Sequence, residues 1–206
     1  MKKLILFAAL AVFGLTQVDA QVKFGAKAGA NLANLVGDIE DNKMLFGFHV
    51  GAVAEFAVSE DFFVAPELLF STQGTKSEYS ETIFGMTYKA EEKLKLSYLA
   101  IPVMAKYQIA DGLTLEAGPQ IGFLMSAKAD YEVSFEGETE SDSEDVKEFM
   151  NSMDFGLNLG LGYRMESGLF FQGRYNIGLS NVADEGGDDY KMNNSVIQFS
   201  VGYFFN

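Results

Sequence analysis

Residues 154–165 read DFGLNLGLGYRM, and every second residue of this stretch is large and apolar. The large side chains alternate with glycines, one asparagine and one arginine; they are Phe155, Leu157, Leu159, Leu161 and Tyr163. Because successive side chains of a β-strand point to opposite faces, this period of two predicts a strand with one apolar and one nearly bare face. A glycine-rich face is a poor surface for water, so the stretch raises the question of what each face contacts.

The composition of the whole chain is that of a folded protein. It has 206 residues, of which 48% are hydrophobic and 14% aromatic, with 21 glycines and neither cysteine nor tryptophan. This length suits one domain of ordinary size. The formal charge of −14 argues against nucleic acid as a partner, because phosphate binding needs clustered lysine and arginine. Without cysteine, the chain can form neither a disulfide nor a thiolate metal site.

The first residues, MKKLILFAALAVFGLTQVDAQ, have the layout of a secretory signal peptide. Two lysines precede an apolar run over 4–15, and Val18, Asp19 and Ala20 form a cleavage pattern. The run is too short to cross a membrane as a helix, and its position and flanks favour a signal peptide over a buried core helix. We expect residues 1–20 to be a signal peptide cleaved after Ala20, and residues 21–206 to form one exported domain. With no cysteine after the cleavage site, a lipoprotein anchor is excluded.

The period of two recurs along the rest of the chain and predicts eight strands, at about 22–34, 46–58, 62–75, 94–108, 113–125, 154–165, 169–180 and 195–205. The connections alternate between long (35–45, 76–93, 126–153 and 181–194) and short (59–61, 109–112 and 166–168). Within the third long connection, residues 141–153 are compatible with a short helical turn. Alternating lengths are typical of a barrel with short periplasmic turns and long extracellular loops. We therefore predict an all-β, eight-stranded, antiparallel up-and-down transmembrane β-barrel.

The two faces of the predicted strands differ sharply. One face is long and apolar and carries no charge, whereas the other holds glycines, amides and a few charged residues. A soluble, lipocalin-like barrel would instead place many charged residues on its outer face. The interior of an eight-stranded barrel is just wide enough for side chains to fill it. We therefore expect the leucines of 154–165 to face lipid and the glycines to face a narrow lumen.

Seven charged residues fall on the predicted lumen face, each near the short-turn end of its strand. They are Lys27, Glu55, Glu67, Lys106, Glu116, Arg164 and Arg174. Three carboxylates and four cations at a similar height can satisfy one another, as buried charges require. We predict a salt-bridge cluster that plugs the lumen; the alternative is a set of unrelated interior polar residues.

Most of the 29 acidic residues fall in the long connections, above all in 126–153. Such segments are usually solvated and self-repelling, and the alternative is a surface for divalent cations or a basic partner. The run DEGGDDY at 184–190 lacks the ligand spacing of a calcium loop. We expect a monomer with no cofactor or metal, whose partners are outer-membrane lipid and, through 126–153, another envelope protein.

Several stretches resemble the PorT-like outer-membrane β-barrel family of Gram-negative bacteria. They are FGAKAGANLANL (24–35), SYLAIPVMAKYQI (97–109), LEAGPQIGFLM (115–125), DFGLNLGLGYRM (154–165) and GLFFQGRYNIGLSNV (168–182). The most specific piece is YLAIPVMAKY followed by a strand containing GPQ. The resemblance implies an outer-membrane location and an eight-stranded barrel. Within that family PorT itself serves a secretion system, but no residue here marks that role.

Residues with catalytic patterns are scarce. His49 is the single histidine, and a serine–histidine–acid arrangement requires a nucleophile and an acid to converge on it. The sequence has no HExxH, phosphate-loop or zinc spacing. The leading prediction is a non-enzymatic barrel with a plugged lumen, acting through its loops or as a structural component. The alternatives are a small-solute pore, an accessory subunit of a secretion or assembly machine, a soluble periplasmic lipid-binding barrel and an outer-membrane enzyme.

Overall fold

The computed structural model describes residues 22–39, 42–83, 86–135, 138–184 and 191–205. The predicted signal peptide and most of the DEGGDDY run lie outside the described residues. The ordered elements are β1 (Val22–Gly37), β2 (Asn42–Ala57), β3 (Phe62–Ile83), β4 (Met86–Ala110), β5 (Leu113–Phe135), β6 (Glu138–Asp145), the 3-10 helix η1 (Lys147–Phe149), β7 (Met153–Arg164), β8 (Leu169–Gly178) and β9 (Met192–Phe204). No helix among the described residues is long and apolar enough to cross a membrane.

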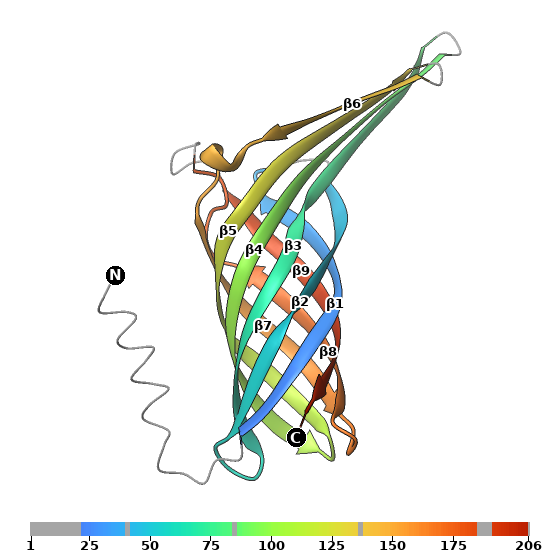
Figure 1. Ribbon diagram of the computed structural model, residues 1–206. Coiled ribbons are helices and arrows are strands. Elements are labelled where there is room, and N and C mark those ends of the chain that lie inside the picture. The colour runs from blue at the N-terminus through green and yellow to red at the C-terminus, as the bar shows by residue number, and fades with distance from the viewer. Residues whose placement is uncertain (1–21, 40–41, 84–85, 136–137, 185–190, 206) are drawn as a thin grey trace.

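Eight of these strands close into a ring. The antiparallel order is β4-β3-β2-β1-β9-β8-β7-β5, and pairing of β4 with β5 completes the circle. β6 lies outside this ring and pairs with the far part of β5. Figure 1 shows the resulting barrel, with the chain's C-terminus at the end that carries the short turns. The prediction of an eight-stranded antiparallel up-and-down barrel is confirmed.

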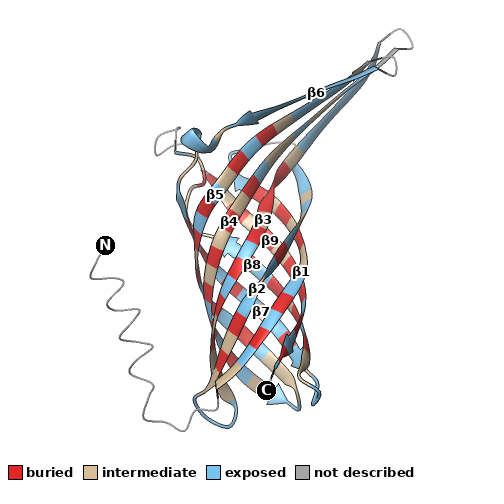
Figure 2. Ribbon diagram, in the orientation of Figure 1, coloured by how far each residue is buried: buried red, intermediate tan, exposed pale blue. Residues whose placement is uncertain are grey.

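The alternation of residue types along each strand becomes an alternation of burial. In β7, Leu157, Leu159 and Leu161 are 37%, 46% and 51% exposed, whereas Asn158 is fully buried. The same alternation runs around the barrel in Figure 2, where buried and exposed residues follow one another along the strands. The apolar residues of 154–165 therefore point outward, and the glycines and the asparagine point into the lumen.

The structure corrects several predicted strand ends. β3, β4 and β5 continue through much of the predicted connections 76–93 and 126–153, and pairing persists to Ile83↔Met86 and Tyr88↔Phe135. Between β1 and β2 only residues 38–41 remain as a connection. These strand ends have polar residues on both faces, so no apolar alternation marks them in the sequence. Backbone pairing with a neighbouring strand holds them extended.

β6 was not predicted at all. Its sequence, ETESDSED, is exposed throughout, and it pairs with β5 from Lys128↔Asp145 to Phe135↔Glu138. The helical turn expected somewhere in 141–153 is limited to η1, because β6 occupies residues 141–145. Beyond the ring, residues 76–83, 86–95, 128–135 and 138–145 form one sheet, here called the projecting sheet. Figure 1 shows this sheet extending away from the barrel at the end opposite the C-terminus.

Candidate functional site

Seven of the eight ring strands each contribute one charged residue to a connected cluster in the lumen, and β7 also buries Asp154 near its other end, outside this cluster. These residues, here called the lumen network, are the seven predicted from the sequence: Lys27 on β1, Glu55 on β2, Glu67 on β3, Lys106 on β4, Glu116 on β5, Arg164 on β7 and Arg174 on β8. Six of them are at most 4% exposed, and the side chain of Arg164 is 23% exposed. The structure brings all seven together inside the barrel.

Arg174 joins the two halves of the lumen network. Its Nη1 and Nη2 donate to Glu67 Oε2 and Oε1, at 2.9 and 2.7 Å, so the two side chains form a bidentate pair. Its Nη2 and Nε also donate to Glu116 Oε2, at 2.7 and 3.0 Å. Lys27 Nζ lies 2.7 Å from Glu67 Oε2, so Glu67 is neutralised by two cations. Charge-assisted, bidentate contacts of this kind are the strong ones among protein hydrogen bonds.

Lys106 continues the network toward the short-turn end. Its Nζ lies 3.5 Å from Glu116 Oε1 and 3.2 Å from Glu55 Oε2, and Arg164 pairs with the other oxygen of Glu55. Cations and carboxylates thus alternate in one connected series: Lys27, Glu67, Arg174, Glu116, Lys106, Glu55 and Arg164. Each carboxylate contacts two cations. Such pairing is what offsets the cost of removing charges from water.

The glycines of β7 make room for these side chains. A Cβ placed on Gly160 would lie 2.7 Å from Arg174 Cγ, and one placed on Gly162 would lie 2.8 Å from Thr114 Oγ1 and would also meet Glu116 Oε1. Real Cβ atoms essentially never approach other atoms this closely. The bare face of DFGLNLGLGYRM is therefore the wall against which Arg174 and Glu116 pack.

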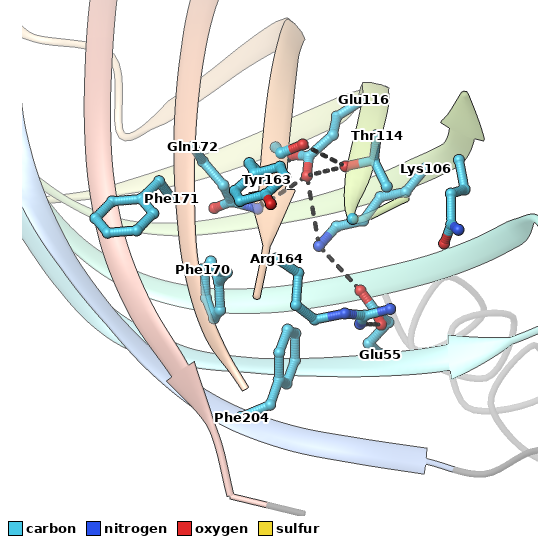
Figure 3. A pocket seen from close by; sticks show the side chains of 13 residues that line it. Glu55, Lys106, Thr114, Glu116, Tyr163, Arg164, Phe170, Phe171, Gln172 and Phe204 are labelled. Carbon is cyan, nitrogen blue, oxygen red and sulfur yellow. Dashed lines mark hydrogen bonds and ion pairs between the residues drawn. The ribbon is translucent and has the colours of Figure 1, made fainter. Parts of the chain in front are cut away.

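The lumen is also filled on the short-turn side of the network. Figure 3 shows Arg164, Lys106 and Glu55 beside two aromatic rings at this end. The rings, Phe170 and Phe204, have centroids 4.8 Å apart, and Lys106 Nζ lies 6.0 and 5.8 Å from them. The cavity between these groups is about 20 Å³, which is roughly the room needed by one water molecule.

On the other side of the network lies a polar layer centred on His49. Its Nδ1 is 2.8 Å from Asn31 Oδ1, and its Nε2 is 2.7 Å from Ser200 Oγ. In the strand register Gly29 lies between His49 and Ser200, and a Cβ on Gly29 would be 2.6 Å from His49 Cε1. The missing side chain of Gly29 thus lets the imidazole reach across β1. Sequence reasoning did not find this group, because the register that aligns these three strands is not visible in the sequence.

The order serine, histidine, asparagine is also that of some hydrolytic triads. Here, however, the group is sealed: His49 and Asn31 are fully buried and Ser200 is 7% exposed. Asn31 Nδ2 donates further to Ser71 Oγ and to the Thr72 carbonyl, at 3.0 and 2.8 Å. A substrate has no approach to Ser200 in this geometry, so the group ties β1, β2, β3 and β9 together.

An apolar group closes the end of the lumen nearest the projecting sheet. It consists of seven buried residues: Leu35, Leu96, Tyr98, Leu124, Ala127, Val182 and Met192. Val182 follows β8 in sequence, and Met192 begins β9, so the β8–β9 connection contributes to this cap. Among the described residues, no group of three or more histidine, cysteine, aspartate or glutamate side chains is arranged to hold a metal ion.

Comparison with solved structures finds similar chains of low identity. Ail, the attachment invasion locus protein of Yersinia pestis, solved in complex with the heparin analogue sucrose octasulfate, is 14% identical, with 89% of this chain and 99% of that chain covered and a TM-score of 0.44. Neisserial surface protein A is 11% identical, with 88% and 97% covered and a TM-score of 0.47. The N-terminal β-barrel domain of Pseudomonas aeruginosa OprF is 12% identical, with 91% and 100% covered and a TM-score of 0.40.

Comparison with curated proteins finds no match. A family model, described as the outer membrane protein beta-barrel domain, matches residues 16–184. That span covers well over half of the chain and includes the strands that supply all seven residues of the lumen network. The chain therefore belongs to the outer membrane protein beta-barrel domain family, and the outer membrane is its location.

Proposed function

We propose that this protein is a closed, non-enzymatic barrel that anchors the projecting sheet outside the outer membrane. It acts as a structural or interaction component of that membrane rather than as a channel. The observation that carries this proposal is the lumen network, which crosses the barrel as one series of ion pairs. The apolar cap and the Phe170–Phe204 pair close the lumen on either side.

The physical argument is that an ion entering the lumen would have to separate pairs that are shielded from water. Breaking a buried pair leaves an uncompensated charge, at a cost of about 3–5 kcal/mol. A cavity of about 20 Å³ offers no continuous path for a hydrated ion. The filled interior therefore favours a plugged barrel over the small-solute pore that the sequence left open.

Conductance across planar bilayers tests this proposal. We expect the wild-type protein to give no single-channel steps in 1 M KCl, a salt concentration chosen to make small conductances visible. The double variant Arg174→Ala/Glu116→Ala removes a paired cation and anion together, and we expect it to give small, flickering currents. Reproducible wild-type steps of one size would overturn the plugged-barrel proposal and favour the pore.

A second function, as an interaction subunit, is favoured by exposed tyrosines on the projecting sheet. Tyr79, Tyr88 and Tyr131 are 55%, 39% and 40% exposed, and register pairing places them on one face. Aromatic residues are enriched in protein interfaces. The partner would be another envelope protein, such as a component of a secretion or assembly machine.

Crosslinking from native outer membranes tests this second function. Asp130 and Ser143 are register partners, so residues 131–142 can be replaced by a short glycine–serine turn without disturbing the pairs below. Loss of a stoichiometric partner in this variant would identify an interaction subunit. Recovery of no partner from either form would leave a self-sufficient structural barrel.

The finer assignment to the PorT-like branch is also a proposal. It rests on YLAIPVMAKY (98–107) and on the GPQ element that follows it (118–120). In the structure Pro102 and Gln120 are register partners on neighbouring strands β4 and β5, so the two elements form one patch of the barrel wall. A role in secretion would require the crosslinked partner to be a component of such a machine.

A further inference from the structure

The projecting sheet has one face that combines tyrosines with carboxylates. This face, here called the tyrosine face, continues the lumen side of the barrel, because its β4 residues alternate in step with the buried Leu96 and Tyr98. Beyond the apolar cap its described side chains form three register rows: Ser77, Glu92, Tyr131 and Asp142; Tyr79, Ala90, Val133 and Glu140; and Glu81, Tyr88 and Glu138. Each row therefore holds one tyrosine and at least one carboxylate.

The aromatic rings of this face are exposed and held in place. In Figure 2 the far part of the projecting sheet is mostly pale blue, and Val133 is 36% exposed beside the three exposed tyrosines. The rings of Tyr79 and Tyr88 meet edge to face with centroids 6.5 Å apart, and the Tyr79 hydroxyl donates to Glu81 Oε2 at 2.5 Å. Rigid tyrosines supply contact area at a low cost in side-chain entropy. An exposed apolar patch rimmed by polar residues is typical of an interaction site.

The carboxylates of the tyrosine face have no cationic partner in the described part of the chain. They are Glu81, Glu92, Glu138, Glu140, Asp142 and Glu144, and none of them appears in an ion pair between described residues. Partial desolvation, and then the negative charges of Glu92 and Glu144, raise the pKa of Tyr131. The rings thus lie in a field of uncompensated negative charge.

The opposite face of the same sheet is balanced in charge. Its lysines are Lys43, Lys76, Lys89, Lys93, Lys95 and Lys128, and its acids are Glu78, Glu91, Asp130, Glu132 and Asp145. Glu78 contacts two of these lysines, and Glu91 and Asp130 contact one each. Because strand side chains alternate between faces, these lysines point away from the tyrosine face. That face must therefore take its positive charge from another molecule.

The spacing of the rows indicates the shape of that molecule. Successive rows are two residues apart along the strands, which is about 7 Å. Lysine or arginine at every second position of an extended segment repeats at the same distance. Such a segment, lying along the strands, would place one cation in each row, against a tyrosine ring and a carboxylate. Cation–π attraction and charge-assisted hydrogen bonds both favour that placement.

We propose that the tyrosine face binds an extended, lysine- or arginine-rich segment of another envelope protein. This inference rests on the proposed role as an interaction subunit and names the partner's chemistry for that role. A second copy of this chain is disfavoured as the occupant, because its own tyrosine face would bring like charges together.

Fluorescence anisotropy tests the proposal with the full mature protein in phosphatidylcholine nanodiscs. The probe is a fluorescein-labelled peptide of four arginine–serine repeats, and four glutamate–serine repeats are its negative control. We expect saturable binding of the arginine peptide that weakens in 0.5 M NaCl. Glu92→Gln/Asp142→Asn should weaken binding about tenfold, and Tyr88→Leu/Tyr131→Leu at least about threefold.

The matched control is Glu91→Gln/Glu132→Gln, which removes two negative charges from register partners on the opposite face. It should bind within about twofold of wild type, and heat-dependent gel mobility should show all variants folded. Equal loss in this control would mean that net charge alone attracts the peptide. Unchanged affinity in the tyrosine variant would mean a purely ionic patch, and displacement by millimolar Ca²⁺ would mean a site for free cations. Each of these results would overturn the proposal.

Site-resolved NMR keeps the test decisive if a variant fails to fold. In the wild type the arginine peptide should shift amides at 88–92 and 131–142, and shifts confined to other parts of the barrel would overturn the proposal. Crosslinking separates this inference from the role on which it rests. A partner that crosslinks through 131–142 but is not displaced by the arginine peptide would keep the interaction role and overturn the basic segment. Specific peptide binding without any crosslinked partner would count against the interaction role and support the binding chemistry.

Discussion

Arg174 is the residue whose loss should disturb the barrel interior most. Its guanidinium makes four hydrogen bonds, two to Glu67 and two to Glu116, and it is 3% exposed. Each hydrogen bond to a charged group contributes about 1.5–3 kcal/mol to the free energy of unfolding. The simple sum for four such bonds, roughly 6–12 kcal/mol, is more than their loss can cost, because the carboxylates keep other partners. Glu67 keeps Lys27 after the change, and Glu116 keeps Lys106. We therefore expect Arg174→Met to lower the free energy of unfolding by about 3–5 kcal/mol.

A second variant separates charge from geometry. Arg174→Lys preserves the positive charge but loses the planar fork that contacts both carboxylates, so we expect a loss of about 1–3 kcal/mol. Lys89→Gln, at an exposed position of the projecting sheet, is the control and should stay within about 0.5 kcal/mol of wild type.

Urea unfolding from phospholipid vesicles measures these differences. Heat-dependent gel mobility and tyrosine emission, from the nine tyrosines of a chain without tryptophan, give two independent probes of the folded fraction. If Arg174→Met unfolds within 1 kcal/mol of wild type, the reasoning is wrong, because the network would then not be a stabilising unit. Equal losses in Arg174→Met and Arg174→Lys would show that packing of the fork, rather than charge, dominates.

Three further predictions concern other parts of the barrel. Gly160→Ala should lower the free energy of unfolding by about 1–3 kcal/mol, because its Cβ would press on the Gly173 carbonyl oxygen and on Arg174. A neutral result in urea unfolding would contradict this by showing that β8 and the lumen network can both shift. The Ser200 hydroxyl should stay unlabelled by a fluorophosphonate probe in the folded protein, and labelling detected by mass spectrometry would contradict the sealed lumen. His49→Ala should lower the free energy of unfolding, because it removes the hydrogen bonds to Asn31 and Ser200. Hydrogen bonds from Lys43 and then Lys76 hold the pKa of Glu78 at about 2, so Lys76→Gln should raise it, as carboxyl NMR titration would show by its midpoint.

The wall of the barrel could be predicted from the sequence because each of its residues faces either lipid or the lumen, and these two environments require different residue types. In β7 the alternation of leucine and glycine specified the strand and its orientation. The ends of β3, β4 and β5 have water on both faces, so their side chains give no period. β6 pairs with β5 through its backbone and through the side-chain hydrogen bonds Ser143–Asp130 and Ser134–Thr139, whereas its acidic sequence alone predicts a loop.

The alternation of inward and outward positions along each strand was enough to predict which residues form the lumen network. It was not enough to predict which of them pair with each other. Which carboxylate meets Arg174 depends on the register between β3, β5 and β8, which is a three-dimensional property. The same applies to His49, whose partners come from β1 and β9. The apolar cap was missed because four of its seven residues, Leu35, Ala127, Val182 and Met192, lie outside the strands predicted from the sequence.

The distribution of the network over seven strands has a consequence for assembly. A slip of one residue in any of these strands turns its charge from the lumen toward hydrocarbon. For a lysine or arginine near the bilayer midplane that exposure costs about 2–4 kcal/mol. It also leaves the partner of that charge buried and unpaired in the lumen. A misaligned strand in the growing barrel is therefore disfavoured by the charges of its neighbours. The series of ion pairs from Lys27 to Arg164 is complete only when all seven strands are in the native register.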